Sequence, residues 1–420
     1  MSNSISAIEP PEFGYWPTVN ALYHERYRQS GLVVLAVNGC GAVDKSRLAG
    51  SVSAIQQYYP PLRCTVSDTG DRYALKAAQD AAQVELECKA LDSEQSIYDI
   101  SEKLATEDLG ARLWRIVLVT NAEHVDRWSL LVFCHHSICD VQSLLLLAED
   151  ILLHYVSDET GLEPRSISAP SGMVPESLSV DMPAEQSQVL ADQETAGAAV
   201  SVQAELSKRV FRWKSLPTQD LDLDALLAAC RREKVTLTNL LVAATLRAVA
   251  TSGNSKVTTA ISFRNRVEPT VPEDAFGCYI GMLESVVPHA ESIWDHARNC
   301  AAVQFQNINR VLLPRLTKPL IEMMMSRRIE GVLRNGEFAG GCAVSNGGVS
   351  TIPAKFGSLT IDSVDYTTLQ LAGLYSMFLS VISHAGKLHM SISYAEPLLS
   401  EDDIKGVIDS VVAELVAVSR

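Results

Sequence analysis

The stretch CHHSICDVQS, Cys134–Ser143, holds two adjacent histidines and, four residues after the second, an aspartate. The residues before it, LWRIVLVTNAEHVDRWSLLVFCHH from Leu113, predict two strands joined by a polar turn at Asn121–Arg127. The residues after it, DVQSLLLLAEDILLHYV, predict a helix capped by Asp140, because apolar residues recur there at helical spacing. The stretch is therefore expected to be a strand end that turns into a helix.

The composition is that of an ordinary globular protein, with 47% hydrophobic and 20% charged residues. A formal charge of -15 argues against nucleic acid as the main partner, because phosphate binding needs a basic face. The nine cysteines form neither a CxxC pair nor a secreted framework, which indicates a reducing compartment. There is no signal-peptide pattern, and the longest apolar run, Leu144–Val156, is too short to span a bilayer. A cytoplasmic protein without a membrane span is expected.

The length of 420 residues exceeds what one hydrophobic core usually serves, so two lobes are predicted. We place an N-terminal lobe at residues 1–165, a linker at 166–205 and a C-terminal lobe at 206–420. The linker lies in a stretch, Ser157–Glu205, that is rich in Ser, Pro, Gly, Ala, Glu and Gln.

In the C-terminal lobe, residues 221–253 predict two helices, the second capped by Thr236. A last amphipathic helix is predicted from about Ser400 to Val418. Strands are predicted at VTTAISFRN, YIGMLESVVP, GCAVSNGGVS and KLHMSISY. Both halves mix strands and helices, which predicts an α/β fold.

The two histidines point to opposite faces if they lie on a strand, so they are not expected to act at one small site. This geometry argues against a zinc site, and the chain has neither an HExxH nor a GxSxG motif. A histidine with an ordinary pKa near 6.5 is neutral at pH 7 and is able to take a proton from a hydroxyl or an amine. On these grounds alone, a general base and a buried structural histidine both remain possible.

Four motifs in the chain resemble those of one family in the same order. HHSICD resembles the HHxxxDG signature of the acyltransferases that use CoA or a carrier protein, which include chloramphenicol acetyltransferase, nonribosomal peptide condensation domains and polyketide-associated acyltransferases. ISFRNRVEP with FGCYIGMLESVVP resembles the RxR stretch and following strand of that superfamily, AVSNGGVSTIP its SNxG stretch, and KLHMSISYAEPLLSEDDI its last strand and helix. The resemblance covers nearly the whole chain.

This resemblance implies an α/β fold of two chloramphenicol-acetyltransferase-like lobes in a V-shaped pseudo-dimer with a central tunnel. It implies that His136 is the general base and that His135 is structural. It also makes Asp140 structural, paired with Arg264, while Arg266 is the less favoured partner. Asp140 as a plain helix cap remains open, and both roles are compatible. No metal and no permanently bound cofactor are implied.

The chain departs from the family pattern in two places. Val141 replaces the glycine that ends the signature, which is expected to alter the turn beside the histidines or the acceptor channel. The DFGWG stretch of the plant and fungal branch is absent, and KFGSLTIDS resembles it only weakly. We therefore favour the polyketide-associated or condensation-like branch.

Three other features of the sequence allow a functional and a structural interpretation. The GxG of VVLAVNGCGAVDKSRL lacks its third glycine, and Asp44 stands where a helix cap would, so we predict a turn rather than a nucleotide site. Cys134 and Cys139 are interpreted as small apolar packing residues. In the resemblance, Ser345 and Asn346 lie near the tunnel, where they are candidates to contact substrate or an oxyanion; a bent Gly-rich strand is the alternative.

The expected function is transfer of an acyl group from a thioester to a hydroxyl or an amine of a small molecule, in polyketide, nonribosomal peptide or lipid secondary metabolism. The donor is expected to be acyl-CoA or a phosphopantetheine-linked acyl carrier protein, and the chain is expected to be a monomer. The alternative is a non-catalytic or repurposed member that binds a carrier protein or its cargo, and Val141 keeps this alternative open.

The segment Asn307–Asn335 is the candidate for donor docking, and its alternative is a solvated helical face. Against two glutamates it carries six basic residues: Arg310, Arg315, Lys318, Arg327, Arg328 and Arg334. CoA phosphates and acidic carrier helices would both be attracted to such a surface. Charge reversal at Arg327 and Arg328 is expected to raise the KM of the donor with little change in kcat, because binding is lost while the base is untouched. Steady-state kinetics at low ionic strength, with CoA and carrier-protein donors in turn, test this, and an unchanged KM for both would remove the segment from the donor site.

Overall fold

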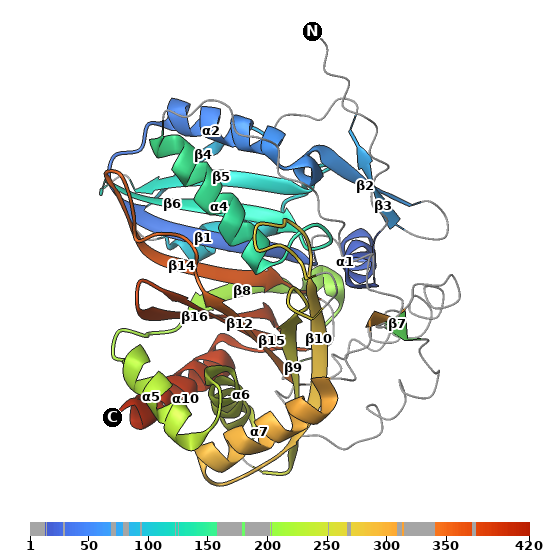
Figure 1. Cartoon of the computed structure of the whole chain (residues 1–420), viewed down its shortest axis with the longest axis vertical. Coiled ribbons are helices and arrows are strands. Elements are labelled where there is room, and N and C mark those ends of the chain that lie inside the picture. The colour runs from blue at the N-terminus through green and yellow to red at the C-terminus, as the bar shows by residue number, and fades with distance from the viewer. Residues whose placement is uncertain are drawn as a thin grey trace.

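The protein is an α/β structure built on two six-stranded sheets, as the sequence predicts (Figure 1). Its computed structural model describes residues 13, 15–27, 30–68, 73–78, 84–92, 95–121, 123–124, 126–157, 179–180, 202, 204–250, 252–266, 270–308, 313–314, 341–371 and 375–420. The helices are α1 (Tyr15–Arg26), α2 (Lys45–Tyr58), α3 (Ile97–Ala105), α4 (Val141–Val156), α5 (Leu223–Glu233), α6 (Leu237–Val249), α7 (Ile293–Ile308) and α10 (Glu401–Ser419), with 3₁₀ turns at Pro60–Arg63 and Leu206–Lys208.

The two sheets use strands from distant parts of the chain. In order across the first sheet these are β13 (Lys355–Phe356), β14 (Leu359–Leu369), β1 (Leu32–Cys40), β6 (Arg127–His135), β5 (Trp114–Asn121) and β4 (Glu87–Leu91). The second sheet contains β10 (Ile280–Pro288), β9 (Asn254–Ser262), β12 (Cys342–Val349), β15 (Met377–His384), β16 (Lys387–Glu396) and β8 (Val210–Ser215). Two short pairs complete the strands: β2 (Cys64–Asp68) with β3 (Tyr73–Ala77), and β7 (Ser179–Val180) with β11 (Leu313–Pro314).

Both faces of the first sheet are covered, which explains why β1 is apolar along most of its length. Val33 and Leu35 belong to the apolar core that includes residues of α2 and α4. Leu32 and Val34 belong to the core that includes α3 and Trp213 of β8. Figure 1 shows α2 and α4 on the outer side of the first sheet and α5, α6, α7 and α10 on the outer side of the second, so the two sheets lie between two layers of helices.

The strand β14 crosses the division that the sequence predicted. It lies in the predicted C-terminal lobe, residues 206–420, yet it pairs antiparallel with β1 of the first sheet, from Leu32 opposite Leu369 to Cys40 opposite Thr360. It also contacts β15 and β16 of the second sheet. The part of the chain after residue 206 therefore contributes strands to both sheets, and pairing between strands so distant in sequence leaves no local pattern. Most of the predicted linker, residues 166–205, lies outside the described residues.

The local predictions made from spacing and caps are confirmed. The predicted hairpin is formed by β5 and β6, which pair antiparallel. Asp140 caps α4, Thr236 caps α6, Ser400 caps α10, and Asp44 caps α2 rather than opening a nucleotide loop. None of the helices that the structure describes has the length and apolar character needed to cross a bilayer.

The β1–β14 pairing predicts different outcomes for two glycine substitutions. A Cβ on Gly39, beside the β-bulge of β1, would lie 2.5 Å from the Thr360 carbonyl oxygen and 2.8 Å from Cζ2 of Trp128. Gly39→Ala is therefore expected to lower the free energy of unfolding by about 1–3 kcal/mol. Gly50→Ala, on the exposed side of α2 with no atom within 4 Å of the new methyl group, is expected to raise it by about 0.5–1 kcal/mol. Urea unfolding of both variants checks this, and equal effects would show that β1 and β14 are not packed as described.

Candidate active site

His136 lies in the turn that follows β6, and backbone groups hold it on two sides. Its backbone N–H donates to the Gly31 carbonyl at 2.8 Å, and its Nδ1 lies 2.7 Å from the Cys139 carbonyl oxygen. Because a carbonyl oxygen only accepts, Nδ1 carries the proton and Nε2 carries the lone pair. Burial lowers the pKa of His136, and the hydrogen bond to Cys139 and the charge of Asp140 partly offset this effect. The ring is therefore neutral at pH 7, with Nε2 able to accept a proton.

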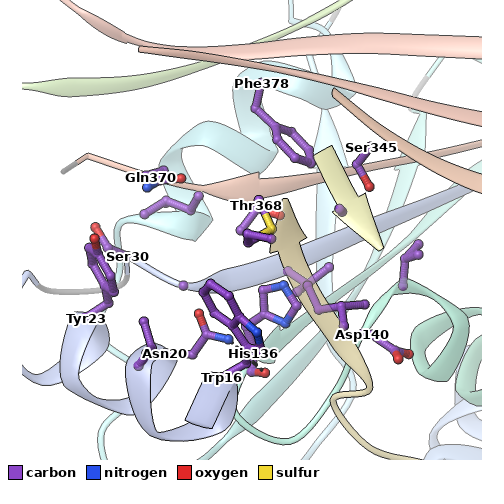
Figure 2. A pocket seen from close by; sticks show the side chains of 18 of the residues that line it. Trp16, Asn20, Tyr23, Ser30, His136, Asp140, Ser345, Thr368, Gln370 and Phe378 are labelled. Atoms are coloured by element: carbon purple, nitrogen blue, oxygen red, sulfur yellow. Dashed lines mark hydrogen bonds between the residues drawn. The ribbon is translucent and has the colours of Figure 1, made fainter. Parts of the chain in front are cut away.

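The His136 side chain lines a pocket of about 130 Å³ that both halves of the fold build. Trp16 and Tyr23 of α1 contribute from one side, and Ser345 of β12 and Phe378 of β15 contribute from the second sheet. Figure 2 shows the imidazole of His136 among these side chains, with Thr368 and Gln370 following one another along the same wall. A cavity of this size accommodates a group comparable to a benzene ring.

His135 has a different environment, although it is the neighbour of His136. Its Nδ1 accepts from the Ser137 backbone N–H at 3.1 Å and lies 2.6 Å from Ser137 Oγ. Its ring packs edge-on against His24, with 4.3 Å between centroids. Burial lowers the pKa of His135 well below its ordinary value, and His24 and His136 add to this. His135 does not line the pocket, so the two histidines serve separate environments.

Asp140 lies beyond the turn and its carboxylate is fully engaged. Oδ1 accepts from the Ser143 backbone N–H at 2.9 Å and lies 3.0 Å from Arg264 Nη2. The Ser143 hydroxyl lies 2.9 Å from Oδ1 and 2.7 Å from the Gly277 carbonyl oxygen, so its one proton is shared between these two acceptors. Oδ2 accepts from the Tyr279 backbone N–H at 3.1 Å. The carboxylate thus caps α4 and forms a buried ion pair at the same time. These contacts leave the Asp140 carboxylate few lone pairs with which to accept a further proton.

Arg264 makes further contacts, although its buried Nε has no hydrogen-bond partner among the described residues. Its Nη1 donates to the Ala275 carbonyl at 2.9 Å, and its guanidinium stacks 4.6 Å from the centroid of the Tyr279 ring. Arg266, the less favoured partner in the sequence, is exposed. The ion pair therefore joins the turn after β6 to the connection between β9 and β10.

Val141, which stands in the place of the family glycine, is the first residue of α4 and lines the pocket. It is not among the residues with positive φ, so its backbone conformation does not require glycine. The substitution therefore changes the wall of the pocket rather than the path of the chain.

The two candidates on β12 face different ways, as neighbours on a strand do. Ser345 lines the pocket, and its hydroxyl lies 2.9 Å from the Tyr366 hydroxyl. The Asn346 amide donates to Thr238 Oγ1 at 3.1 Å, and its Oδ1 accepts from the Gly348 backbone N–H. Ser345 therefore lines the same pocket as His136, whereas Asn346 does not line it.

Sequence reasoning missed most of the other pocket residues. Trp16, Asn20 and Tyr23 lie on one side of α1 at helical spacing, and Thr368 and Gln370 alternate along the end of β14. Such spacing predicts that each group of residues shares one face of a helix or a strand. It does not predict that these faces lie beside His136.

The cysteines near the histidines are buried. Cys134 and Cys139 are both free and buried. Burial raises the pKa of the Cys139 thiol well above its ordinary value, and Cys134 and Cys278 add to this. A nucleophilic cysteine needs a lowered pKa, so this environment disfavours a thiolate. Among the described residues, no three His, Cys, Asp or Glu side chains group in a way that would hold a metal.

The donor-docking candidates Arg310, Arg315, Arg327 and Arg328 lie outside the described residues, as do Lys318 and Arg334. Their proposed role therefore rests on the sequence.

Asp140 and Asp44 provide a matched pair for measuring the ion pair. Both cap a helix, but Asp44 does so from an exposed position. Asp140→Ala is expected to lower the free energy of unfolding by about 3–5 kcal/mol, because it leaves Arg264 buried without its partner. Asp44→Ala is expected to cost about 1 kcal/mol, the usual value for a lost cap. Urea unfolding and turnover are measured together; an inactive Asp140→Ala protein with wild-type stability would instead assign the carboxylate a direct catalytic role.

Comparisons with known proteins give a likeness in structure and none in sequence. No family model and no curated protein matches the chain by sequence. Among solved structures, TRI3 trichothecene 15-O-acetyltransferase from Fusarium sporotrichioides has 12% identity, a TM-score of 0.74 and coverage of 97% of this chain and 94% of that one. The first condensation domain of the calcium-dependent antibiotic synthetase, in complex with a substrate analogue, has 12% identity, a TM-score of 0.70 and coverage of 98% and 96%. The X-domain from teicoplanin biosynthesis has 13% identity, a TM-score of 0.65 and coverage of 99% and 96%.

The alignments extend over nearly the full length of this chain and of each neighbour, and both six-stranded sheets lie within the aligned part. At these low identities the likeness concerns the fold. The chain therefore shares its two-sheet fold with this acetyltransferase and with these domains of peptide synthesis.

Proposed function

We propose that this protein is an acyltransferase that moves an acyl group from a thioester to a small-molecule acceptor. The observation that carries the proposal is the state of His136. Its Nδ1 is committed to the Cys139 carbonyl, and its ring lines a pocket built by both halves of the fold, so Nε2 is the free base in that pocket. The likeness in fold to an acetyltransferase and to condensation domains supports this reading.

The reaction needs one base and one hydrogen-bond donor. Nε2 of His136 takes the proton of the acceptor as the acceptor atom attacks the thioester carbonyl and the new bond forms. The tetrahedral oxyanion then collapses, the carbon–sulfur bond breaks, and the protonated imidazole returns its proton to the departing sulfur. The Ser345 hydroxyl, in the same pocket, is the candidate donor to the oxyanion.

The lining of the pocket favours a hydroxyl over an amine as the acceptor. Among the lining residues that the structure describes, Asp140 is the one carboxylate, and no lysine or arginine is present. Asp140 is neutralised by Arg264 and surrounded by donors. An alkylammonium ion would therefore enter a pocket with no free carboxylate, at the cost of removing its charge from water. An uncharged alcohol carries no such cost.

The donor is proposed to be an acyl-CoA or an acyl group on the phosphopantetheine arm of a carrier protein. The basic segment Asn307–Asn335 is the proposed docking surface for either one. The natural products named for two of the similar structures, a calcium-dependent antibiotic and teicoplanin, support a place in natural-product biosynthesis. No permanently bound cofactor is part of the proposal.

The second candidate function is a non-catalytic member of the fold that binds a carrier protein or its cargo. Val141 favours it, because this residue lines the pocket at the position where the family signature has glycine. Mass spectrometry of acyl transfer separates the two functions. Acetyl-CoA and an acyl carrier protein are each incubated with 2-phenylethanol and with 2-phenylethylamine, which differ in the acceptor group alone. Ester formation in excess of amide supports the proposal, whereas carrier-protein binding without transfer supports the second candidate.

Replacement of His136 tests the base directly. His136→Ala is expected to remain folded and to lower kcat by about 10²- to 10⁴-fold, the usual range for general-base catalysis. In the wild type, kcat/KM is expected to rise with pH as the imidazole loses its proton. The midpoint of this rise is expected below pH 6.5, because burial lowers the pKa of His136. Near-full activity in His136→Ala together with loss of activity in His135→Ala would show that the wrong histidine has been assigned.

A further inference from the structure

The strand β12 is interrupted beside the pocket, in the sequence Ser345-Asn346-Gly347-Gly348. Its pairing with β15 changes register between Asn346 and Val349, so this stretch forms a bulge. Gly348 has a φ of +77°, a conformation that favours glycine. A Cβ on Gly347 would lie 3.1 Å from Cε1 of Tyr366. The bulge thus makes room for the ring of Tyr366.

Tyr366 reaches this bulge from the other sheet. It lies on β14 of the first sheet, and its hydroxyl lies 2.8 Å from the Ser345 carbonyl oxygen and 2.9 Å from Ser345 Oγ. Burial raises the pKa of Tyr366, and its hydrogen bonds with the Ser345 side chain and with the backbone of Val381 and Gly347 offset a part of this rise. The phenol therefore keeps its proton, and this one proton is shared between the carbonyl oxygen and the Oγ of Ser345.

When the Ser345 hydroxyl accepts the hydrogen bond from Tyr366, it keeps its own proton for another acceptor. A serine hydroxyl that accepts one hydrogen bond is able to donate another. Among the described residues, Tyr366 is the one hydrogen-bond partner of the Ser345 hydroxyl, and the Ser345 side chain lines the pocket with His136. The proton of Ser345 is thus available to a group in the pocket.

The remaining polar groups of the bulge are also held in place. Gln142 of α4 donates from Nε2 to the Gly347 carbonyl at 2.6 Å. Asn346 donates to Thr238 of α6 and accepts from the Gly348 backbone N–H. Residues of β14, α4 and α6 therefore fix the stretch from different sides. A bulge held in this way is a preorganised site rather than a flexible loop.

We propose that Tyr366 is a positioning residue for the acyl transfer, holding the Ser345 hydroxyl so that it donates to the oxyanion that forms on the thioester carbonyl. This role rests on the proposed function. It explains why a tyrosine and not a phenylalanine crosses between the sheets here. A phenylalanine would fill the same space, but it would leave the carbonyl and the hydroxyl of Ser345 without a hydrogen-bond donor. The buried hydroxyl of Tyr366 is tolerated because it is hydrogen-bonded.

Kinetics of Tyr366→Phe, Ser345→Ala and the double variant test the role, with acetyl-CoA and the alcohol that the wild type acylates best. Ser345→Ala is expected to lower kcat by about 10²- to 10³-fold, the usual effect of a lost oxyanion donor. Tyr366→Phe is expected to lower kcat by about 10- to 100-fold through misplacement of that donor, with the KM of both substrates unchanged. The double variant is expected to match Ser345→Ala, because Tyr366 acts through Ser345. The pH at which kcat/KM rises should stay at its wild-type value, since His136 is untouched.

Tyr394→Phe is the matched control. Tyr394 is buried on β16, does not line the pocket, and its hydroxyl has no partner among the described residues. It is expected to keep the wild-type kcat. Gly347→Ala is a second probe of the same contact, because its methyl group displaces the Tyr366 ring while the phenol hydroxyl remains; it is expected to lower kcat as Tyr366→Phe does.

Two results would overturn the role of Tyr366 alone: wild-type kcat in both Tyr366→Phe and Gly347→Ala, or losses that multiply in the double variant. Loss of stability without loss of kcat in Tyr366→Phe would assign the phenol a purely structural place. Absence of turnover by the wild type with every donor and acceptor would overturn the proposed function and this role with it.

Discussion

Four hydrogen-bond donors meet at the carboxylate of Asp140, and they come from parts of the chain that are far apart in sequence. Ser143 provides a backbone N–H and a hydroxyl, Arg264 provides Nη2, and Tyr279 provides a backbone N–H. A buried carboxylate costs several kcal/mol unless its partners are all in place. The turn after β6 and the connection between β9 and β10 are therefore fixed together or not at all. Because β6 and β9 belong to different sheets, this one contact also sets how the two sheets meet around the pocket.

The geometry of His136 depends on that contact through the backbone. Cys139, whose carbonyl receives the Nδ1 proton, directly precedes Asp140, and the Asp140 backbone N–H donates to the Gly277 carbonyl at 3.0 Å. Fixing Asp140 on both its backbone and its side chain leaves the Cys139 carbonyl little freedom. The carbonyl in turn fixes the tautomer and the orientation of the imidazole. A base oriented by backbone groups on a rigid turn needs no further side chain to select its tautomer.

The sequence predicted those features whose parts lie close together along the chain. The sequence predicted that His135 and His136 face different environments, although His136 lies in the turn after β6 rather than on the strand, and the spacing after Asp140 predicted the capped helix. The place of β14 between β13 and β1 was not predicted, since its partner β1 lies at the other end of the chain. For the same reason Ser345 and Asn346 could not be told apart from the sequence: alternation predicts that they face opposite ways, while the packing of the two sheets decides which one lines the pocket.

The pKa of the His136 imidazole reflects opposing effects of its buried surroundings. Burial lowers the pKa of the imidazole, which keeps it neutral but makes it a weaker base. The Cys139 carbonyl and the negative charge of Asp140 act in the other direction. A general base is most effective when its pKa lies near the working pH, so these offsets would favour the catalysis proposed for His136. Arg264, however, lies 3.0 Å from Asp140 and compensates much of its charge. The ion pair with Arg264 thus limits how far Asp140 raises the pKa of His136. The hydrogen bond from Nδ1 to the Cys139 carbonyl raises this pKa more than Asp140 does, because the two groups are in direct contact.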